Sequence, residues 1–459
     1  MAQLAHIKNI SKTVSNLFPR VNKTHFIESS IHHTFIDEYM PINNVDTDRF
    51  IEFRIPRSVG NFIDLASIHL QFHLMVKKRT ASANAWSAYS PTVFGDHFAL
   101  SEGSAYSLFK HLSIDFNGVQ VTNVPNYALD SYIRLLTQFP NEEVNKLGKL
   151  LGISNPDTVI RSTADDSYFD GLQKTDPNAA NHLKLIRDKG LHLRAPLITD
   201  ITGIQAYLLD GIEIVIRLTL HENSSVILTA QNNPSVDGDG NKKFYLNISN
   251  ISLQVKKIKP TDNSYTALQQ TLLPKAENVI PMLDYVFTSR IVKQYHLPSG
   301  QAEHYLDLPY GNTIPDRIFI VFQHYSNFNT KAWKENLLYL EHLELSNIYV
   351  TINGTTMFNI NCDFENYNVA ELYNLTLLSL RTDKHLLTYE KFINGCTVIG
   401  LPLSTYDASA DIRAPYFGVL RIRLTFTTRL ADPAIAYLSG DIISILSINS
   451  NRNIYLNSQ

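Results

Sequence analysis

The chain has 459 residues, 44% of them hydrophobic and 18% charged, and its formal net charge is −3. The hydrophobic content excludes an intrinsically disordered chain, and the small net charge excludes a general electrostatic attraction to nucleic acid. The two cysteines, Cys362 and Cys396, are too few for a disulfide framework or a four-thiolate zinc site.

The length favours two domains of about 200 residues each. The 23 tyrosines and 23 phenylalanines, together with many Val, Ile and Thr residues, favour β-strands, because such side chains pack well on a pleated surface. We therefore expect a mainly β protein with two domains.

The N-terminal segment, residues 1–30, carries apolar residues at spacings of three and four with basic residues beside them: Leu4, Ile7, Ile10, Val14 and Leu17. This pattern predicts an amphipathic basic arm. Its apolar residues are interrupted, unlike those of a signal peptide, so we expect a protein that is made inside the cell and is not secreted by that route. The arm could contact DNA, a membrane or other subunits, and its apolar content favours a protein contact.

The β pattern follows the arm. Arg49–Pro56 and Phe62–Lys77 are predicted to be the first two strands. Further along, an alternating segment runs into Asn117-Gly118, a dipeptide typical of a tight hairpin turn. Apolar residues at helical spacing then predict a helix over Tyr127–Phe139.

A second short helix is predicted from Pro140. The segment Asn155–Arg194 is polar and shows no sustained period, so it is predicted to be a long surface loop. The first half then closes near Pro260 with three predicted strands: Ile204–Leu209, Ile212–Leu220 and Phe244–Val255.

The second half is again mostly strands, with one helix predicted over Val369–Leu380. Its predicted strands are Val286–Leu297, Arg317–Tyr325, Leu345–Ile352, Thr397–Leu403, Val419–Arg429 and Asp441–Ile448.

Four landmarks of the first half return in the same order in the second half. They pair Leu112–Gly118 with Ile348–Gly354, Asn126-Tyr127 with Asn366-Tyr367, Ile216–Leu220 with Ile422–Phe426, and Tyr245-Leu246 with Tyr437-Leu438. We interpret this order as an internal duplication. It predicts two tandem eight-stranded antiparallel jelly rolls, a double jelly roll with inserted short helices and long loops, over residues 31–265 and 266–459.

The segment Asp48–Leu65, followed by SLFKHLSIDFNGVQVTNVPNYALDSYIRLL, resembles the N-terminal half of Polinton (Maverick)-type and adintovirus-like double jelly-roll major capsid proteins. Those proteins share a strand pair, an Asn-Gly hairpin and a following helix in this order. The resemblance covers about the first third of the chain, and the Asn155–Arg194 loop has no counterpart in it.

The resemblance implies a homotrimer whose six jelly rolls form a pseudo-hexagonal tile of an icosahedral shell. It implies a virion protein that binds its own copies and a minor (penton) capsid protein, with no small-molecule substrate. Two alternatives remain open: a lectin-like jelly roll that stacks sugars on exposed aromatic side chains, and a minor capsid protein, although such proteins are typically single jelly rolls. A cupin-like metalloenzyme ranks last, because no cluster of metal ligands is visible.

We expect no enzyme and assign no catalytic, cofactor-binding or metal-binding residue. The P-loop, His-Glu-x-x-His and Gly-x-Ser-x-Gly motifs are missing from the sequence. The acidic run at Asp237–Asn241 lacks the glycine and glutamate of a calcium loop, so a plain hairpin loop is favoured.

Four potential metal ligands of other kinds are also interpreted as structural. Adjacent residues in an extended segment point to opposite faces, so His32 and His33 are expected to be surface or interface residues. Cys362 and Cys396 could meet near His385, but free cysteines are commonly small buried hydrophobic residues.

Overall fold

The computed structural model describes residues 30–43, 49–79, 86–88, 98–101, 103–138, 148, 150–153, 190–204, 206–221, 227–229, 244–273, 281–307, 309–325, 336–380, 385–404 and 416–458. Residues 1–29 of the predicted arm, the start of the helix expected from Pro140, the loop at Asp237 and most of the 155–194 segment lie outside these residues, whereas residues 148, 150 and 151 are described and helical.

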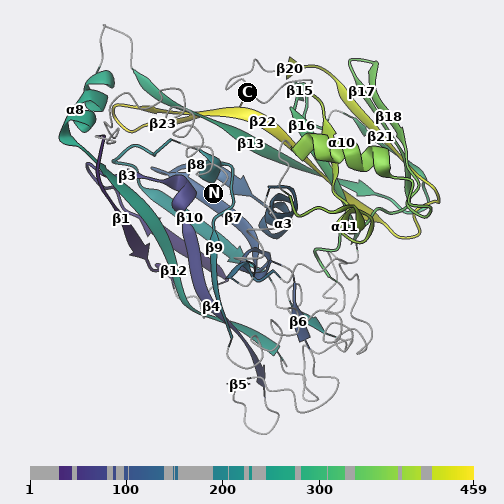
Figure 1. The fold of residues 1–459 in the computed structure, drawn as a ribbon, viewed down its shortest axis with the longest axis horizontal. Coiled ribbons are helices and arrows are strands. Elements are labelled where there is room, and N and C mark those ends of the chain that lie inside the picture. The colour runs from purple at the N-terminus through teal and green to yellow at the C-terminus, as the bar shows by residue number, and fades with distance from the viewer. Residues whose placement is uncertain are drawn as a thin grey trace, which may run out of the picture.

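The first half forms a sandwich of two antiparallel sheets (Figure 1). One sheet has the order β1-β12-β4-β9, and the other has the order β2-β10-β7-β8. Consecutive strands of the chain are thus distributed between facing sheets in the order of an eight-stranded jelly roll. The strands are β1 (Ile31–Tyr39), β2 (Phe50–Ile55), β4 (His69–Arg79), β7 (Phe109–Phe116), β8 (Val119–Val124), β9 (Leu191–Pro196), β10 (Ile214–Leu220) and β12 (Phe244–Pro260).

The second half repeats this order strand for strand. Its sheets are β13-β22-β16-β19 and β14-β21-β17-β18, so the protein is a double jelly roll, as predicted. The strands are β13 (Met282–Leu297), β14 (Glu303–Asp307), β16 (Arg317–His324), β17 (Leu345–Ile352), β18 (Thr355–Asn361), β19 (Ile399–Pro402), β21 (Leu420–Phe426) and β22 (Ala434–Asn449).

Short strands and helices complete the fold. The strands are β3 (Phe62–Ile63), β5 (Trp86–Ala88), β6 (Phe98–Leu100), β11 (Ile227–Thr229), β15 (Thr313–Ile314), β20 (Tyr416–Phe417) and β23 (Ile454–Ser458). The α-helices are α2 (Ser104–Ser107), α3 (Tyr127–Gln138), α8 (Asp262–Thr271), α10 (Ala370–Leu380) and α11 (Tyr389–Ile393), and the 3₁₀ helices are η1 (Leu65–Ser67) and η2 (Ile201–Gly203).

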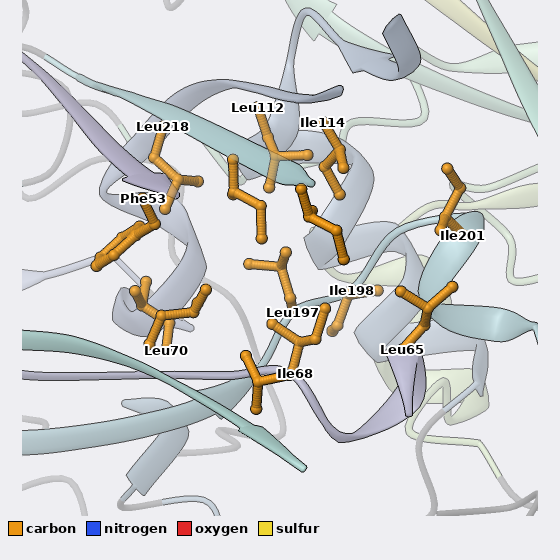
Figure 2. Packing of buried hydrophobic residues seen from close by; sticks show 14 of the residues in the cluster. Phe53, Leu65, Ile68, Leu70, Leu112, Ile114, Leu197, Ile198, Ile201 and Leu218 are labelled. Carbon is orange, nitrogen blue, oxygen red and sulfur yellow. The ribbon is translucent and has the colours of Figure 1, made fainter. Parts of the chain in front are cut away.

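Along the strands, buried apolar residues alternate with residues that face outward, and the buried ones build the core of each sandwich. In β2, Ile51, Phe53 and Ile55 are fully buried, while Glu52 and Arg54 between them face outward. Figure 2 shows how side chains of facing strands and of the connecting segments meet in the first core: Phe53, Leu65, Ile68, Leu70, Leu112, Ile114, Leu197, Ile198, Ile201 and Leu218. Because one face of each sheet is buried, a register slip of one residue would expose this whole set.

The strand register supports the duplication at the predicted positions. Ile216 pairs with Ile114, and its counterpart Ile422 pairs with Val350. Both hairpin turns have two consecutive residues with positive φ, at Asn117-Gly118 and Asn353-Gly354, as a two-residue type I′ turn requires. The fourth landmark lies on equivalent strands at different positions. Leu246 pairs with Val76, the eighth residue of β4, whereas Leu438 pairs with Ile320, the fourth residue of β16.

Several predicted strands need correction. β1 precedes the segment that was predicted to hold the first strand, and Phe62–Lys77 is interrupted by η1 before β4 begins. Ile204–Leu209 forms no strand among its described residues, and Leu208 makes only an isolated bridge to Ile63. Its apolar side chains fill the core from a loop, which a pattern of apolar residues does not distinguish from a strand. The last four residues of the predicted 155–194 loop belong to β9.

Candidate functional site: the seam between the two sandwiches

Each hydrophobic core contains residues from the other half of the chain. Strands β13 and β22 pair over their full 16 residues, and Figure 1 shows them running from one sandwich across to the other. The first core therefore includes five residues from β13, β22 and β23: Tyr285, Phe287, Leu446, Ile448 and Ile454. In return, the second core includes four residues of α3: Leu129, Tyr132, Ile133 and Leu136.

Helix α3 lies between the sandwiches, and its sequence explains why. Eleven of its twelve residues are buried. Tyr127 and Leu135 belong to the first core, whereas the four residues named above belong to the second. A helix that is apolar on two faces must be covered on both, so α3 is shared by the two sandwiches.

A buried network of charges joins α3 to the second sandwich. On α3, Arg134 forms an ion pair with Asp130 at 2.7 Å and a second one with Asp200. Across the seam, Arg290 of β13 reaches Asp130 at 3.4 Å and Asp441 of β22 at 2.9 Å. The chain of contacts thus passes from the first sandwich into the second without leaving the interior.

The network ends on helix α10. Arg317 binds Asp441 at 2.6 Å and donates to the carbonyl oxygens of Ser379 and Leu380, which are among the last carbonyls of α10. Three arginines face three aspartates, so the buried charges balance. Burial by itself would raise the pKa of Asp441, but the guanidinium groups of Arg290 and Arg317 hold that pKa well below its usual range.

A second group of polar contacts closes the other end of the seam. Arg452, in the turn between β22 and β23, binds the Asp210 carboxylate at 2.7 Å and also donates to the Asp210 carbonyl. The Asn117 side chain donates to the Arg452 carbonyl at 2.9 Å. Tyr285 accepts from the Leu209 amide and donates to the Tyr207 carbonyl.

These contacts fix the relative orientation of the two sandwiches. Buried ion pairs add little net stability compared with apolar packing. Removing one partner of such a pair, however, strongly destabilises the folded protein, because the other charge stays buried without a partner. Two such groups, at the two ends of one interface, allow a single arrangement of the halves. The role of this site is therefore structural, because its contacts join the two sandwiches into one rigid block.

The residues weighed as metal ligands have other partners. Cys362 and Cys396 are free and buried, the first donating to the Leu345 carbonyl and the second lying 3.3 Å from the Tyr132 hydroxyl. Burial raises the pKa of the Cys362 thiol to about 12, so it is an inert thiol at neutral pH.

The expectation that His32 and His33 point to opposite faces is wrong. The register of β1 shifts between Ile31 and His33, and this irregularity brings the two imidazole Nδ1 atoms to 2.7 Å. Both residues are exposed. Among the described residues, no group of three or more His, Cys, Asp or Glu side chains could hold a metal ion, and no helix is long and apolar enough to cross a bilayer.

Neither a family model nor a curated protein matches this chain. Solved structures do match it over nearly its whole length. A chain of the Sputnik virophage structure aligns with a TM-score of 0.63 at 15% identity, covering 96% of this chain and 92% of its own. The Faustovirus major capsid protein aligns with a TM-score of 0.57 at 11% identity, covering 94% of this chain and 93% of its own. The mavirus major capsid protein aligns with a TM-score of 0.50 at 11% identity, covering 97% of this chain and 93% of its own.

The protein shares the fold of viral double jelly-roll major capsid proteins. Coverage of more than nine tenths in both directions means that this chain has both sandwiches and the connections between them, and not one sandwich alone.

Proposed function

We propose that the protein is a major capsid protein that assembles as a homotrimer, and that its trimers tile an icosahedral virus-like shell. The observation that carries this proposal is the seam: two jelly rolls joined into one rigid block by shared cores and buried ion pairs. A shell needs building blocks that keep their shape under load. Three such blocks would present six sandwiches in a pseudo-hexagonal outline.

The resemblance of the first third of the sequence to Polinton-type capsid proteins supports a place in that group. We propose further that the protein is located in the virion, that a minor capsid protein fills the vertices, and that the arm of residues 1–30 contacts the interior of the shell. The protein would then act without a substrate or cofactor.

Size-exclusion chromatography with light scattering, followed by negative-stain imaging, tests this proposal. We expect a mass of three chains, about 156 kDa from the 52.0 kDa monomer, and pseudo-hexagonal particles. A chain that stays monomeric at all concentrations, salt conditions and temperatures tested would overturn the proposal.

One observation favours the lectin-like alternative as a second candidate. On the outer face of sheet β14-β21-β17-β18, Tyr305, Arg423 and Tyr349 are register partners in one row. Tyr305 is exposed, and the Arg423 guanidinium lies 5.0 Å from the centre of the Tyr349 ring. Aromatic side chains on a flat sheet can stack against sugars. Strong glycan binding by a monomer that is lost in Tyr305→Ala would favour this alternative over a capsid role.

A further inference from the structure

Strand β1 begins with a β-bulge that holds two adjacent histidines. Ile31 pairs with Pro260 of β12. The next residue in the register is His33, which pairs with Lys259, so His32 has no counterpart on β12. In a bulge, two residues of one strand lie opposite one residue of the other, and the extra residue changes the direction of the side chains. The alternation that would send adjacent side chains to opposite faces is therefore interrupted here.

The two imidazole rings approach each other through their Nδ1 atoms. These atoms are 2.7 Å apart, and the ring centres are 5.0 Å apart with the ring planes inclined by 70°. At this separation one Nδ1 donates its proton and the other accepts it through a lone pair. The N–H bond and the lone pair each lie in the plane of a ring, so both Nδ1 atoms point into the space between the rings. One shared proton occupies the position that a common metal ion would take.

The separation of the Nδ1 atoms suits a single metal ion. Imidazole nitrogen binds Zn²⁺ and similar ions at about 2.0–2.1 Å, so two ligands at a right angle lie about 2.9 Å apart and two at the tetrahedral angle about 3.3–3.4 Å apart. The observed 2.7 Å is closer to the right-angle value. Right angles between ligands are typical of the square-planar and tetragonal sites of Cu²⁺ and Ni²⁺, whereas structural Zn²⁺ is mostly tetrahedral.

The surroundings leave the pair open to an ion. Both histidines are exposed, and β1 pairs with β12 alone among the described strands. The Phe35 ring lies 5.6 Å from the ring of His33 and limits its rotation. Lys259, opposite His33, is also exposed, so water screens the repulsion between its ammonium group and a bound cation. Water can fill the remaining coordination positions, as it does in open metal sites.

We propose that His32 and His33 bind one divalent transition-metal ion, Cu²⁺ or Ni²⁺, through their Nδ1 atoms, with water as the remaining ligands. The ion would replace the proton that the two rings share, because a metal ligand must be deprotonated. The sequence spoke against a site at these residues through the expectation of opposite faces, and the bulge removes that objection. This inference goes beyond the proposed capsid function and does not depend on it.

Calorimetric titration with CuCl₂ tests the site in the full-length chain, prepared without a polyhistidine tag. The comparison is between wild type, His32→Gln, His33→Gln and the control His296→Gln. His296 is also exposed, but its ring packs against Tyr325 at 5.4 Å and neither of its neighbours in the sequence is a histidine. The chain has 16 histidines, so the control measures what a single surface imidazole contributes.

We expect the tightest Cu²⁺ site of the wild type to weaken by at least about tenfold in each of the two β1 variants. Even a change in the groups that orient a metal ligand costs about 10–100-fold in affinity. His296→Gln should keep the wild-type affinity. Circular dichroism should show unchanged folding in all three variants, because each side chain is exposed. Equal affinity in wild type and the β1 variants, or an equal loss in His296→Gln, would overturn the site.

Electron paramagnetic resonance of the Cu²⁺ complex identifies the ligands. The wild-type spectrum should show coupling to two imidazole nitrogens, and each β1 variant should show coupling to one at most. Ni²⁺ should also bind the wild type more tightly than Zn²⁺, because the separation of the two Nδ1 atoms fits a right angle. A wild-type spectrum with a single coupled nitrogen would overturn the two-histidine site, and tighter binding of Zn²⁺ would overturn the assigned class of ion.

Discussion

Asp441 is the residue on which the seam network depends. Its two carboxylate oxygens bind Arg290 and Arg317; the side chains of Asp441 and Arg290 are buried, and that of Arg317 is 13% exposed. Without this carboxylate, two guanidinium groups would remain in the interior with one acidic partner fewer.

We predict that Asp441→Asn destabilises the folded protein by about 3–5 kcal/mol, the usual cost of breaking a buried pair from one side. Chemical denaturation of wild type and variant measures this difference. Asp307→Asn is the control, because Asp307 and Arg421 form a pair that is 63% and 66% exposed, and its loss should change stability by less than about 1 kcal/mol. Equal effects of the two substitutions would contradict the role given to the network.

The stability difference between wild type and Asp441→Asn should also depend on pH. The pKa of Asp441 is lowered in the folded state, so its stabilising contribution is present above the ordinary aspartate pKa of about 3.9 and is lost as the pH falls toward the folded value. The stability difference between wild type and Asp441→Asn should therefore be constant from pH 7 to about pH 5 and shrink below about pH 4. A difference that stays constant down to pH 3 would mean that Asp441 does not titrate in this way.

At the scale of elements, the two hairpin turns provide an internal comparison. Asn117 and Asn353 have similar positive φ angles of 48° and 52°, and each accepts a hydrogen bond from a neighbouring loop, at Glu213 and Val419. Asn117 also donates to Arg452 across the seam. Alanine at either position would therefore carry a similar backbone strain. The two substitutions differ in that only Asn117→Ala also removes a hydrogen bond across the seam.

We predict that Asn117→Ala costs about 0.5–1.5 kcal/mol more than Asn353→Ala, the contribution of one hydrogen bond. Thermal unfolding of the two variants under identical conditions measures this. Identical melting temperatures would show that the bond to Arg452 contributes nothing to holding the halves together.

At the scale of the whole molecule, the shared cores affect where the chain can be divided into domains. We propose a first unit over residues 31–265 and a second over residues 266–459. Helix α8 spans this boundary and packs on the first core through Leu268 and Leu272, which favours a cut a few residues later, after Leu273. Each unit would still lack side chains that its core takes from the other.

We predict that residues 1–273 and 274–459 expressed separately do not fold cooperatively, and that co-expression restores a soluble complex. The first piece would lose Tyr285, Phe287 and three more core residues, and the second would lose all of α3. Denaturant titration followed by circular dichroism distinguishes the cases. A sharp unfolding transition in either isolated piece would show that its sandwich is independent.

The sequence alone determined the alternation, the hairpins and the order of landmarks. Asn117-Gly118 and Asn353-Gly354 were identifiable because few residues tolerate two consecutive positive φ angles, and strands such as Leu345–Ile352 were found because one face of each is buried. These signals are local, so they are visible in a short window of sequence. They led to the double jelly roll and, with the family resemblance, to a capsid role.

Only the tertiary structure decided how the halves are joined. Nothing in the sequence near Asp130, Arg290 or Asp441 marks them as partners, because they are brought together from three distant elements. The apolar residues of α3 predicted a helix but not that two cores would share it. β1 and β14 were missed because edge strands carry mixed side chains, and their identity comes from pairing with β12 and β21. Long-range pairing depends on the whole chain, and no short segment contains it.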